Sequence, residues 1–97
     1  MNITVKFIGL PDLQKMIGGQ EIQVKIKGNS FGALLEQLVE TYGKPIKEIL
    51  LAEKKKNQVS LLIQVLRNEE HWIERVDSDC LLRDGDTITF MMMVAGG

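Results

Sequence analysis

The residues best suited to chemistry in this sequence are the last two, Gly96 and Gly97. They follow an apolar run that begins at Phe90 and gives way to small residues. Glycine is costly to order, so a glycine pair that forms no turn and caps no helix indicates that another molecule approaches the backbone closely. Such a tip could enter a narrow tunnel and present the α-carboxylate of Gly97 to the active site of a second protein.

Other reactive residue types are too scattered to form a second site. The single cysteine, Cys80, and the single histidine, His71, are interpreted as structural and surface residues. Asp84 and Asp86 flank Gly85, and this combination of residue types predicts a turn. We do not interpret the two aspartates as a metal site, because such a site would need further ligands at suitable spacing. A phosphate-binding G-x-x-x-x-G-K-[ST] loop is absent from the sequence. We therefore expect this chain to bind no cofactor and no metal, and to be unable to activate its own terminus.

Composition and charge predict one globular domain, residues 1–97, and exclude several classes of protein. A chain of 97 residues with 44% apolar residues is large enough for a single core. The 12 basic and 13 acidic residues leave a net charge of −1, so there is no positive field to attract nucleic acid. A single cysteine and the lack of an 18-residue apolar run predict a cytoplasmic protein without a signal peptide or membrane span.

The glycine pair is predicted to extend from a final strand over residues 87–93. Ile88, Phe90 and Met92 alternate with the residues between them, which is the two-residue period of a strand with one buried face. We expect these three side chains in the core. Met91 and Met93 then lie on the opposite face, where they could contact a partner, and residues 93–97 are predicted to form a flexible tail.

Other strands must support that final strand. The same pattern predicts them over residues 2–8, 20–27, 59–66 and 71–73. Pro11 and the Gly18–Gly19 pair interrupt the pattern after the first strand, so we expect a loop of about ten residues there. The run 59–66 is apolar on both faces, which is typical of a covered strand. Trp72 is expected to pack at the edge of the sheet.

One main helix is predicted over residues 31–42. Its apolar residues recur at helical spacing, Ser30 is a suitable N-cap, and Gly43 suits the C-terminal end. A second, short helix is predicted over residues 45–53. Because one main helix can cover only one face of a mixed sheet, the predicted fold class is α+β with two layers.

Three stretches of the sequence coincide in an order typical of one family. They are SFGALLEQL at 30–38, LRDGDTI at 82–88 and VAGG at 94–97. Together they resemble the sulfur-carrier branch of the ubiquitin-like proteins. The resemblance is closest to the small subunit of molybdopterin synthase, with the thiamine sulfur carrier a more distant relative. It implies a ubiquitin-like β-grasp fold, in which one main helix packs across a mixed sheet.

The resemblance also implies a function for the terminal glycines. In this family a partner enzyme of the ubiquitin-activating type uses ATP to adenylate the terminal carboxylate, here that of Gly97. Sulfur from a persulfide then replaces AMP and leaves a thiocarboxylate. In the molybdopterin case the tail enters the large subunit of the synthase and donates sulfur to the pterin precursor. The chain would therefore not be catalytic alone, and would form half of an enzyme with that subunit.

One departure from the family pattern concerns the tail. Relatives commonly carry prolines before the VAGG end, where this chain has Met91, Met92 and Met93. Methionine is flexible and adapts to an interface, whereas proline would hold the tail extended. The predicted partner-binding residues are Met91, Met93, Val94 and Ala95. The loop at 52–60, with its three lysines, is longer than in a minimal relative and has no assigned role.

Three alternatives share the same terminus. An activated Gly97 could be captured by a lysine amine, which would make the chain a protein modifier. It could instead deliver sulfur for thiamine or for another acceptor. In a third alternative the chain is an adaptor whose sheet face binds a partner and whose tail is inert.

Overall fold

The computed structural model describes residues 1–52, 58–74 and 77–92. Its elements follow the predicted order with one additional helix. In chain order they are β1 (Asn2–Ile8), α1 (Pro11–Ile17), β2 (Glu21–Lys25), α2 (Phe31–Tyr42), the π-helical turn η1 (Ile46–Leu50), β3 (Ile63–Arg67), β4 (His71–Ile73) and β5 (Thr87–Met92).

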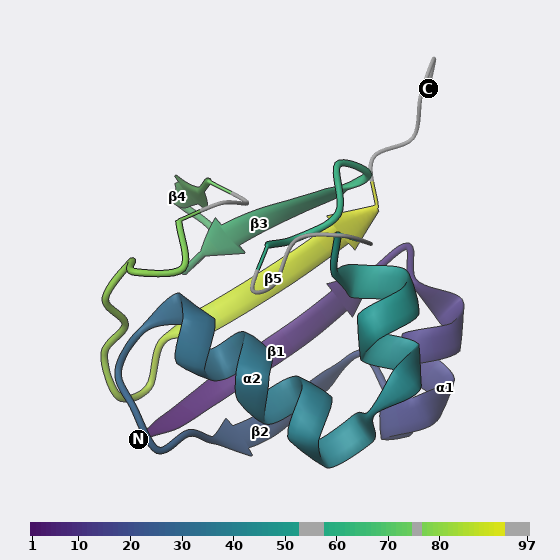
Figure 1. Cartoon of the computed structure of the whole chain (residues 1–97), viewed down its shortest axis with the longest axis horizontal. Coiled ribbons are helices and arrows are strands. Elements are labelled where there is room, and N and C mark those ends of the chain that lie inside the picture. The colour runs from purple at the N-terminus through teal and green to yellow at the C-terminus, as the bar shows by residue number, and fades with distance from the viewer. Residues whose placement is uncertain (53–57, 75–76, 93–97) are drawn as a thin grey trace.

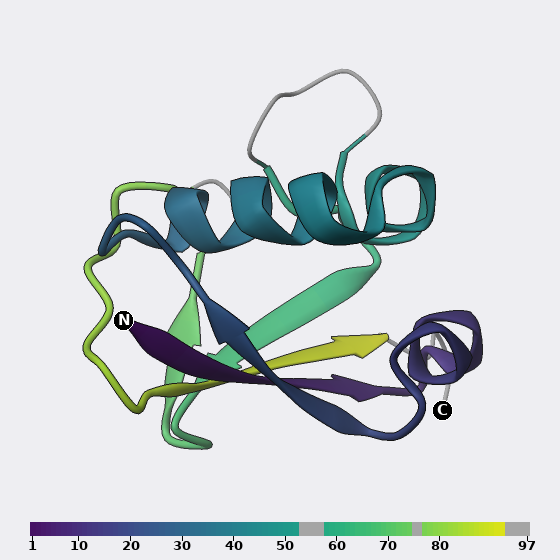
Figure 2. The same ribbon diagram turned by 90° about the horizontal axis from the view of Figure 1, so that it is seen from below.

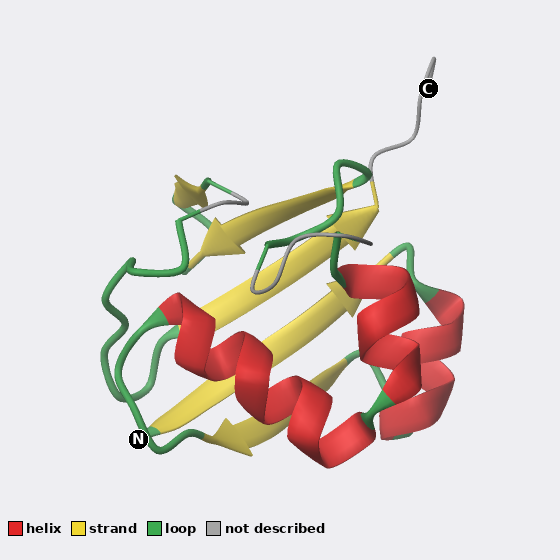
Figure 3. Ribbon diagram, in the orientation of Figure 1, coloured by secondary structure: helices red, strands yellow, loops and turns green. Residues whose placement is uncertain are grey.

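The strands form one mixed sheet in the order β2-β1-β5-β3-β4. The last strand of the chain lies at the centre of this sheet, where β5 pairs in parallel with β1 and antiparallel with β3 (Figure 1). Figure 3 shows the strands as one layer with the helices packed beside it. This arrangement confirms the predicted α+β class. The end of β5 is held by hydrogen-bonded neighbours on both sides.

Helix α2 packs across one face of the sheet (Figure 2). Ser30 caps its first turn, because its hydroxyl accepts the Ala33 N–H at 3.1 Å. Gly43 ends the helix with a φ of 73°, and its N–H donates to the Val39 carbonyl at 2.7 Å. The observed bounds equal the predicted ones, since both ends are fixed by local capping residues.

The core lies between α2 and the sheet and follows the predicted alternation, except that Met92, which was expected in the core, is only partly buried against it. Burying a large apolar side chain contributes about 1.5–3 kcal/mol, so this layer is the main source of stability. Its fully buried side chains on β1, α2 and β5 are Ile3, Val5, Phe7, Phe31, Leu34, Leu35, Leu38, Ile88 and Phe90.

The predicted loop between the first two strands is wrong, because a helix, α1, occupies most of it. Pro11 begins that helix at a position where its missing N–H is not needed. Leu10 and Leu13 are three residues apart and are both buried, which fixes one face of the helix against the core. Gly18 ends it in the left-handed conformation with a φ of 77°.

The second predicted helix is shorter than expected. It is the π-helical turn η1, which ends at Leu50 rather than at residue 53. Ile46 and Leu50 are fully buried, which explains why the turn lies against the core. None of the helices in the described parts of the chain is long and apolar enough to cross a membrane.

The predicted strand over 59–66 is also partly wrong, because β3 begins at Ile63. Val59 is buried in an isolated bridge, and a turn follows in which the Ile63 N–H donates to the carbonyl three residues earlier at 3.0 Å. Leu61 and Leu62 occupy the middle of that turn and are 71% and 60% exposed. The apolar run is therefore a bridge, a turn and a strand, and hydrophobicity alone could not separate them.

Candidate functional site

Most of the predicted site lies outside the described residues. Gly96 and Gly97, together with the predicted partner-binding residues Met93, Val94 and Ala95, belong to the undescribed part of the chain, 93–97. Met91 is described, and it lies next to the last residue of β5. The structure therefore defines the segment from which the terminal residues extend.

That segment is anchored by its position in the sheet. Met91 is paired with Ile8 of β1 and with Gln64 of β3. Met92 is paired with Ile63, the first residue of β3. Because β5 has a strand on each side, its end is fixed in position relative to the whole sheet.

An aromatic cluster fixes β5 from the core side. The Phe90 ring lies 5.8 Å from the Phe7 ring of β1 and 6.1 Å from the Phe31 ring of α2, measured between centroids. These separations suit attractive aromatic packing. Phe90 therefore links the strand that leads to the terminus with both the sheet and the helix.

Gly9 lies close beside the end of β5. It has a φ of 69°, which is unfavourable for residues with a side chain. A Cβ added at Gly9 would lie 3.4 Å from the Cβ of Met92. The glycine thus lets the chain turn sharply after β1 while staying in contact with the last described residue.

Met91 faces away from α2, on the opposite side of the strand from Phe90. It is partly exposed, and its neighbour Ile8 on the same face is 47% exposed. These positions agree with the predicted face of Met91, and its contact with a partner remains a prediction.

Thr89, which shares this face, is not accessible to a partner. It is only 3% exposed, because it lies at the centre of the sheet between its paired neighbours Lys6 and Leu66. Its hydroxyl has no hydrogen-bond partner among the described residues. A partner that contacts Met91 would therefore not reach the Thr89 side chain.

Sequence reasoning did not predict the exposure of four apolar residues that it had assigned to strands. Leu61 and Leu62 were assigned to a covered strand, and Ile8 to the end of a half-buried one. Trp72 was expected to pack at the sheet edge, but it is 61% exposed, so that prediction is wrong. The sequence contained a signal for the exposure of Ile8, because Ile8 follows Thr4 and Lys6 at two-residue spacing and so lies on the polar face of its strand.

The predicted turn at Asp84–Asp86 is confirmed, and it lies at the other end of β5. The Gly85 N–H donates to the Asn2 carbonyl at 2.8 Å, and the Asn2 N–H donates to Asp84 Oδ1 at 2.6 Å. Gly85 has a φ of 88°, which explains why glycine is required there. The turn joins the start of β5 to the start of β1.

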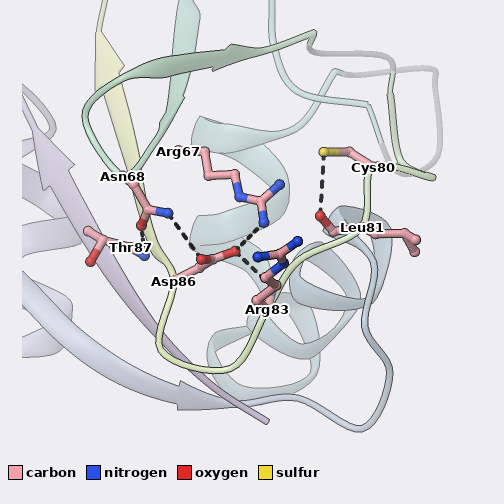
Figure 4. A network of polar contacts seen from close by, with 7 residues as sticks. All are labelled: Arg67, Asn68, Cys80, Leu81, Arg83, Asp86 and Thr87. Atoms are coloured by element: carbon pink, nitrogen blue, oxygen red, sulfur yellow. Dashed lines mark hydrogen bonds and ion pairs between the residues drawn. The ribbon is translucent and has the colours of Figure 1, made fainter.

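Asp86 is the centre of the polar network shown in Figure 4. Its Oδ2 accepts the Arg83 N–H at 2.8 Å and lies 2.8 Å from Nη2 of Arg67. Its Oδ1 accepts Nδ2 of Asn68 at 3.0 Å, and Asn68 Oδ1 accepts the Thr87 N–H at 2.8 Å. Both carboxylate oxygens are therefore used to hold the loop, β3 and β5 together.

The ionised form of Asp86 is favoured by this network. Burial raises the pKa of Asp86, but the Arg83 N–H, the Asn68 amide and the charge of Arg67 together lower it below its ordinary value. The carboxylate thus has a structural role at neutral pH.

The remaining reactive side chains do not meet. Cys80 is partly buried, with its Sγ 3.9 Å from the Leu81 carbonyl, and His71 is exposed beside Glu70. No group of three metal-ligating side chains occurs among the described residues.

Comparison with known proteins decides the family. The model of the ThiS family matches residues 10–97, which is most of the chain and includes the terminal glycines. The chain belongs to the ThiS family. It is thus a member of the ubiquitin-like β-grasp sulfur carriers, as its sequence pattern predicted. A comparison with curated proteins found no match.

Solved structures of this fold resemble the chain over nearly all its length. SAMP1 from Haloferax volcanii has a TM-score of 0.73 and 21% identity, with 100% of both chains covered. A chain of the BexX/CysO complex from Amycolatopsis orientalis has a TM-score of 0.70 and 27% identity, covering 98% of this chain and 99% of the other. A putative molybdopterin converting factor, subunit 1, from Pyrococcus furiosus has a TM-score of 0.66 and 20% identity, covering 97% and 99%.

Proposed function

We propose that this ThiS-family member is a sulfur carrier whose reactive group is the carboxylate of Gly97. The observation that carries the proposal is the family match, which continues through Gly96 and Gly97 rather than stopping at the end of the sheet. A fixed β5 supports it, because a reactive group at the end of a short segment is best presented from a rigid base.

The proposed chemistry needs three steps. The Gly97 carboxylate attacks the α-phosphorus of ATP on an adenylating partner, and pyrophosphate leaves. A persulfide then attacks the acyl adenylate, AMP leaves, and a thiol reduces the resulting acyl disulfide to a thiocarboxylate. Glycine at positions 96 and 97 would keep side-chain bulk away from the carboxylate as it attacks ATP and from the acyl carbon that the persulfide then attacks.

The partner would supply the catalytic groups. The side chains around the end of β5, namely Ile8, Gln64 and Met91, carry neither an acid nor a base. The charged network of Asp86 lies at the opposite end of the strand and serves the turn. ATP would accordingly be bound by the adenylating enzyme of the ubiquitin-activating type and not by this chain.

For the acceptor we propose the molybdopterin precursor, with the large subunit of molybdopterin synthase as the second partner. The sequence resemblance to the small subunit supports this choice, and the Pyrococcus furiosus neighbour is named as a putative molybdopterin converting factor. Met91, Met93, Val94 and Ala95 would then line the contact with the large subunit. Adding that subunit and the precursor to thiocarboxylated chain would yield the dithiolene.

A reconstitution tests whether the Gly97 carboxylate is adenylated, which is the step that the carrier role requires. Purified chain is mixed with the adenylating enzyme of its source cells and labelled pyrophosphate, and label exchange into ATP is measured. We expect exchange that depends on this chain and is lost when Gly97 is deleted. Exchange that is unchanged by the deletion, or absent with the intact chain, would contradict the proposal.

A protein modifier is the second candidate, because the same activated Gly97 could acylate a lysine. This candidate is supported by the similarity to SAMP1, since a second similar structure is that of small archaeal modifier protein 1 from the same organism. Conjugates of higher mass in cells, lost when Gly97 is deleted, would indicate the modifier. Free thiocarboxylate without conjugates would indicate the carrier.

A further inference from the structure

The turn before β3 exposes two leucines on a rigid support. We define the Leu61–Leu62 corner as these two residues, which are 71% and 60% exposed. The Ser60 N–H donates to the Leu50 carbonyl at 2.8 Å, and the Ser60 hydroxyl accepts the Leu62 N–H at 3.2 Å. Turn positions ordinarily carry Gly, Pro, Asn, Asp or Ser, so two leucines held outward here need an explanation.

The corner lies beside the end of β5. Ile63, which follows Leu62 directly, is paired with Met92, the last described residue. Figure 1 shows the turn before β3 next to the tip of the β5 arrow. Residues 93–97 would span at most about 16–18 Å if fully extended. An active site that receives Gly97 must therefore come within that distance of the end of β5, and the corner lies directly beside this end.

The surface next to the corner is open along the outer edge of β3. The pairing of β3 with β4 covers only Val65–Arg67, so Ile63 and Gln64 have no β4 partner. An open hollow lies there, and Leu61 lines it together with Trp72. Of the described residues that line this hollow, only Glu74 is charged.

We infer that the Leu61–Leu62 corner is a docking point for the adenylating enzyme that receives the tail, and that it meets an uncharged, apolar surface of that enzyme. The inference rests on the proposed function, because the partner comes close to the corner only if its active site receives Gly97. The corner binds and orients the carrier, while the terminal glycines supply the reacting group. Loss of the corner therefore weakens binding and leaves the chemistry of the bound complex unchanged.

The test compares steady-state kinetics of adenylation for three forms of the full chain. The Leu61→Gln/Leu62→Gln double variant is expected to raise KM for the carrier about tenfold or more with kcat unchanged. Leu81→Gln is the matched control, because Leu81 is 63% exposed and lies near the start of α2, at the far end of the sheet. It is expected to leave both constants within about twofold of the parent values.

A chain ending at Ala95 separates docking from tail chemistry. This truncated chain is expected to inhibit adenylation of the parent, and to lose that inhibition when it also carries both glutamines. If the double variant unfolds, Leu62→Gln alone replaces it in both assays.

The outcomes distinguish the two proposals. A double variant with the KM of the parent, or a Leu81→Gln control that is equally impaired, would overturn the docking inference while the carrier function stands. An enzyme that does not adenylate even the parent chain would overturn both.

Discussion

Asp86 is the side chain on which the turn before β5 most depends. Both its oxygens accept hydrogen bonds, and Arg67 forms an ion pair with it at 2.8 Å. In Asp86→Asn one oxygen becomes an amide donor that would face the Arg83 N–H or the Asn68 amide. We expect the free energy of unfolding to fall by about 2–3 kcal/mol. Urea titration measures this, with exposed Asp79→Asn as a control that should change it by less than about 0.5 kcal/mol.

The same residue predicts a pH dependence. Because the pKa of Asp86 is lowered in the folded protein, the unfolded chain binds its proton first as pH falls. Its contribution to stability is therefore complete above the ordinary Asp pKa of about 3.9 and is lost as pH falls through the folded value. The difference in unfolding free energy between parent and Asp86→Asn should therefore become smaller as pH falls from 6 to 3. A difference that stays constant across this range would show that ionisation is not the cause.

Substitutions of Thr89 test whether its buried hydroxyl, at the centre of the sheet, lowers the stability of the protein. The hydroxyl has no partner among the described residues, so Thr89→Val replaces an unsatisfied polar group by a methyl of similar shape. We expect stability to be unchanged or to rise by up to about 1 kcal/mol. Thr89→Ser keeps the hydroxyl and loses the methyl, and should destabilise by about 1 kcal/mol. A destabilised valine variant in thermal unfolding would mean that the hydroxyl is bonded after all.

At the level of elements, Phe90 joins β5 to β1 and α2. Its ring is fully buried between Phe7 and Phe31, so Phe90→Ala should reduce the free energy of unfolding by about 3–5 kcal/mol. Met91→Ala changes the next residue, which faces away from the core, and should cost clearly less. Equal losses for the two variants in denaturant titrations would contradict this assignment of the two faces.

The elements that sequence predicted well are those with local signals. Helix α2 was predicted to the residue because Ser30 and Gly43 cap it, and β1 because its alternation is unbroken. Helix α1 was missed because Pro11 was interpreted as a break, although proline is equally suited to begin a helix. The start of β3 was misplaced because Leu61 and Leu62 look like strand residues, and only tertiary context places them in a turn.

The reactive residues of the candidate site could be predicted from the sequence, but the residues that lie around them in space could not. The terminal glycines and the Asp84–Asp86 turn are readable in the sequence because each depends on neighbouring residues. The Leu61–Leu62 corner joins the site only through the pairing of β3 with β5, which links residues far apart in the chain. Such pairings are not encoded in a local pattern.

At the scale of the whole molecule, folding and tail chemistry should be separable. Among the described residues, the buried apolar core extends from Ile3 to Phe90 and so precedes the terminal glycines in the sequence. Gly97→Ala should therefore change the free energy of unfolding by no more than about 0.5 kcal/mol, and should slow adenylation about tenfold or more. Calorimetry and pyrophosphate exchange on one preparation measure both effects. A large fall in Tm, or full activity, would contradict the separation.

The central claim, that Gly97 carries sulfur, is tested most directly by the mass of the protein isolated from its source cells. The protein is purified without added thiols, its intact mass is measured, and fragmentation locates any change. The account predicts a fraction of molecules in which one oxygen at Gly97 is replaced by sulfur, and no such fraction in cells that lack the adenylating enzyme. Gly97 found only in isopeptide bonds to lysine, with no thiocarboxylate under these conditions, would contradict it.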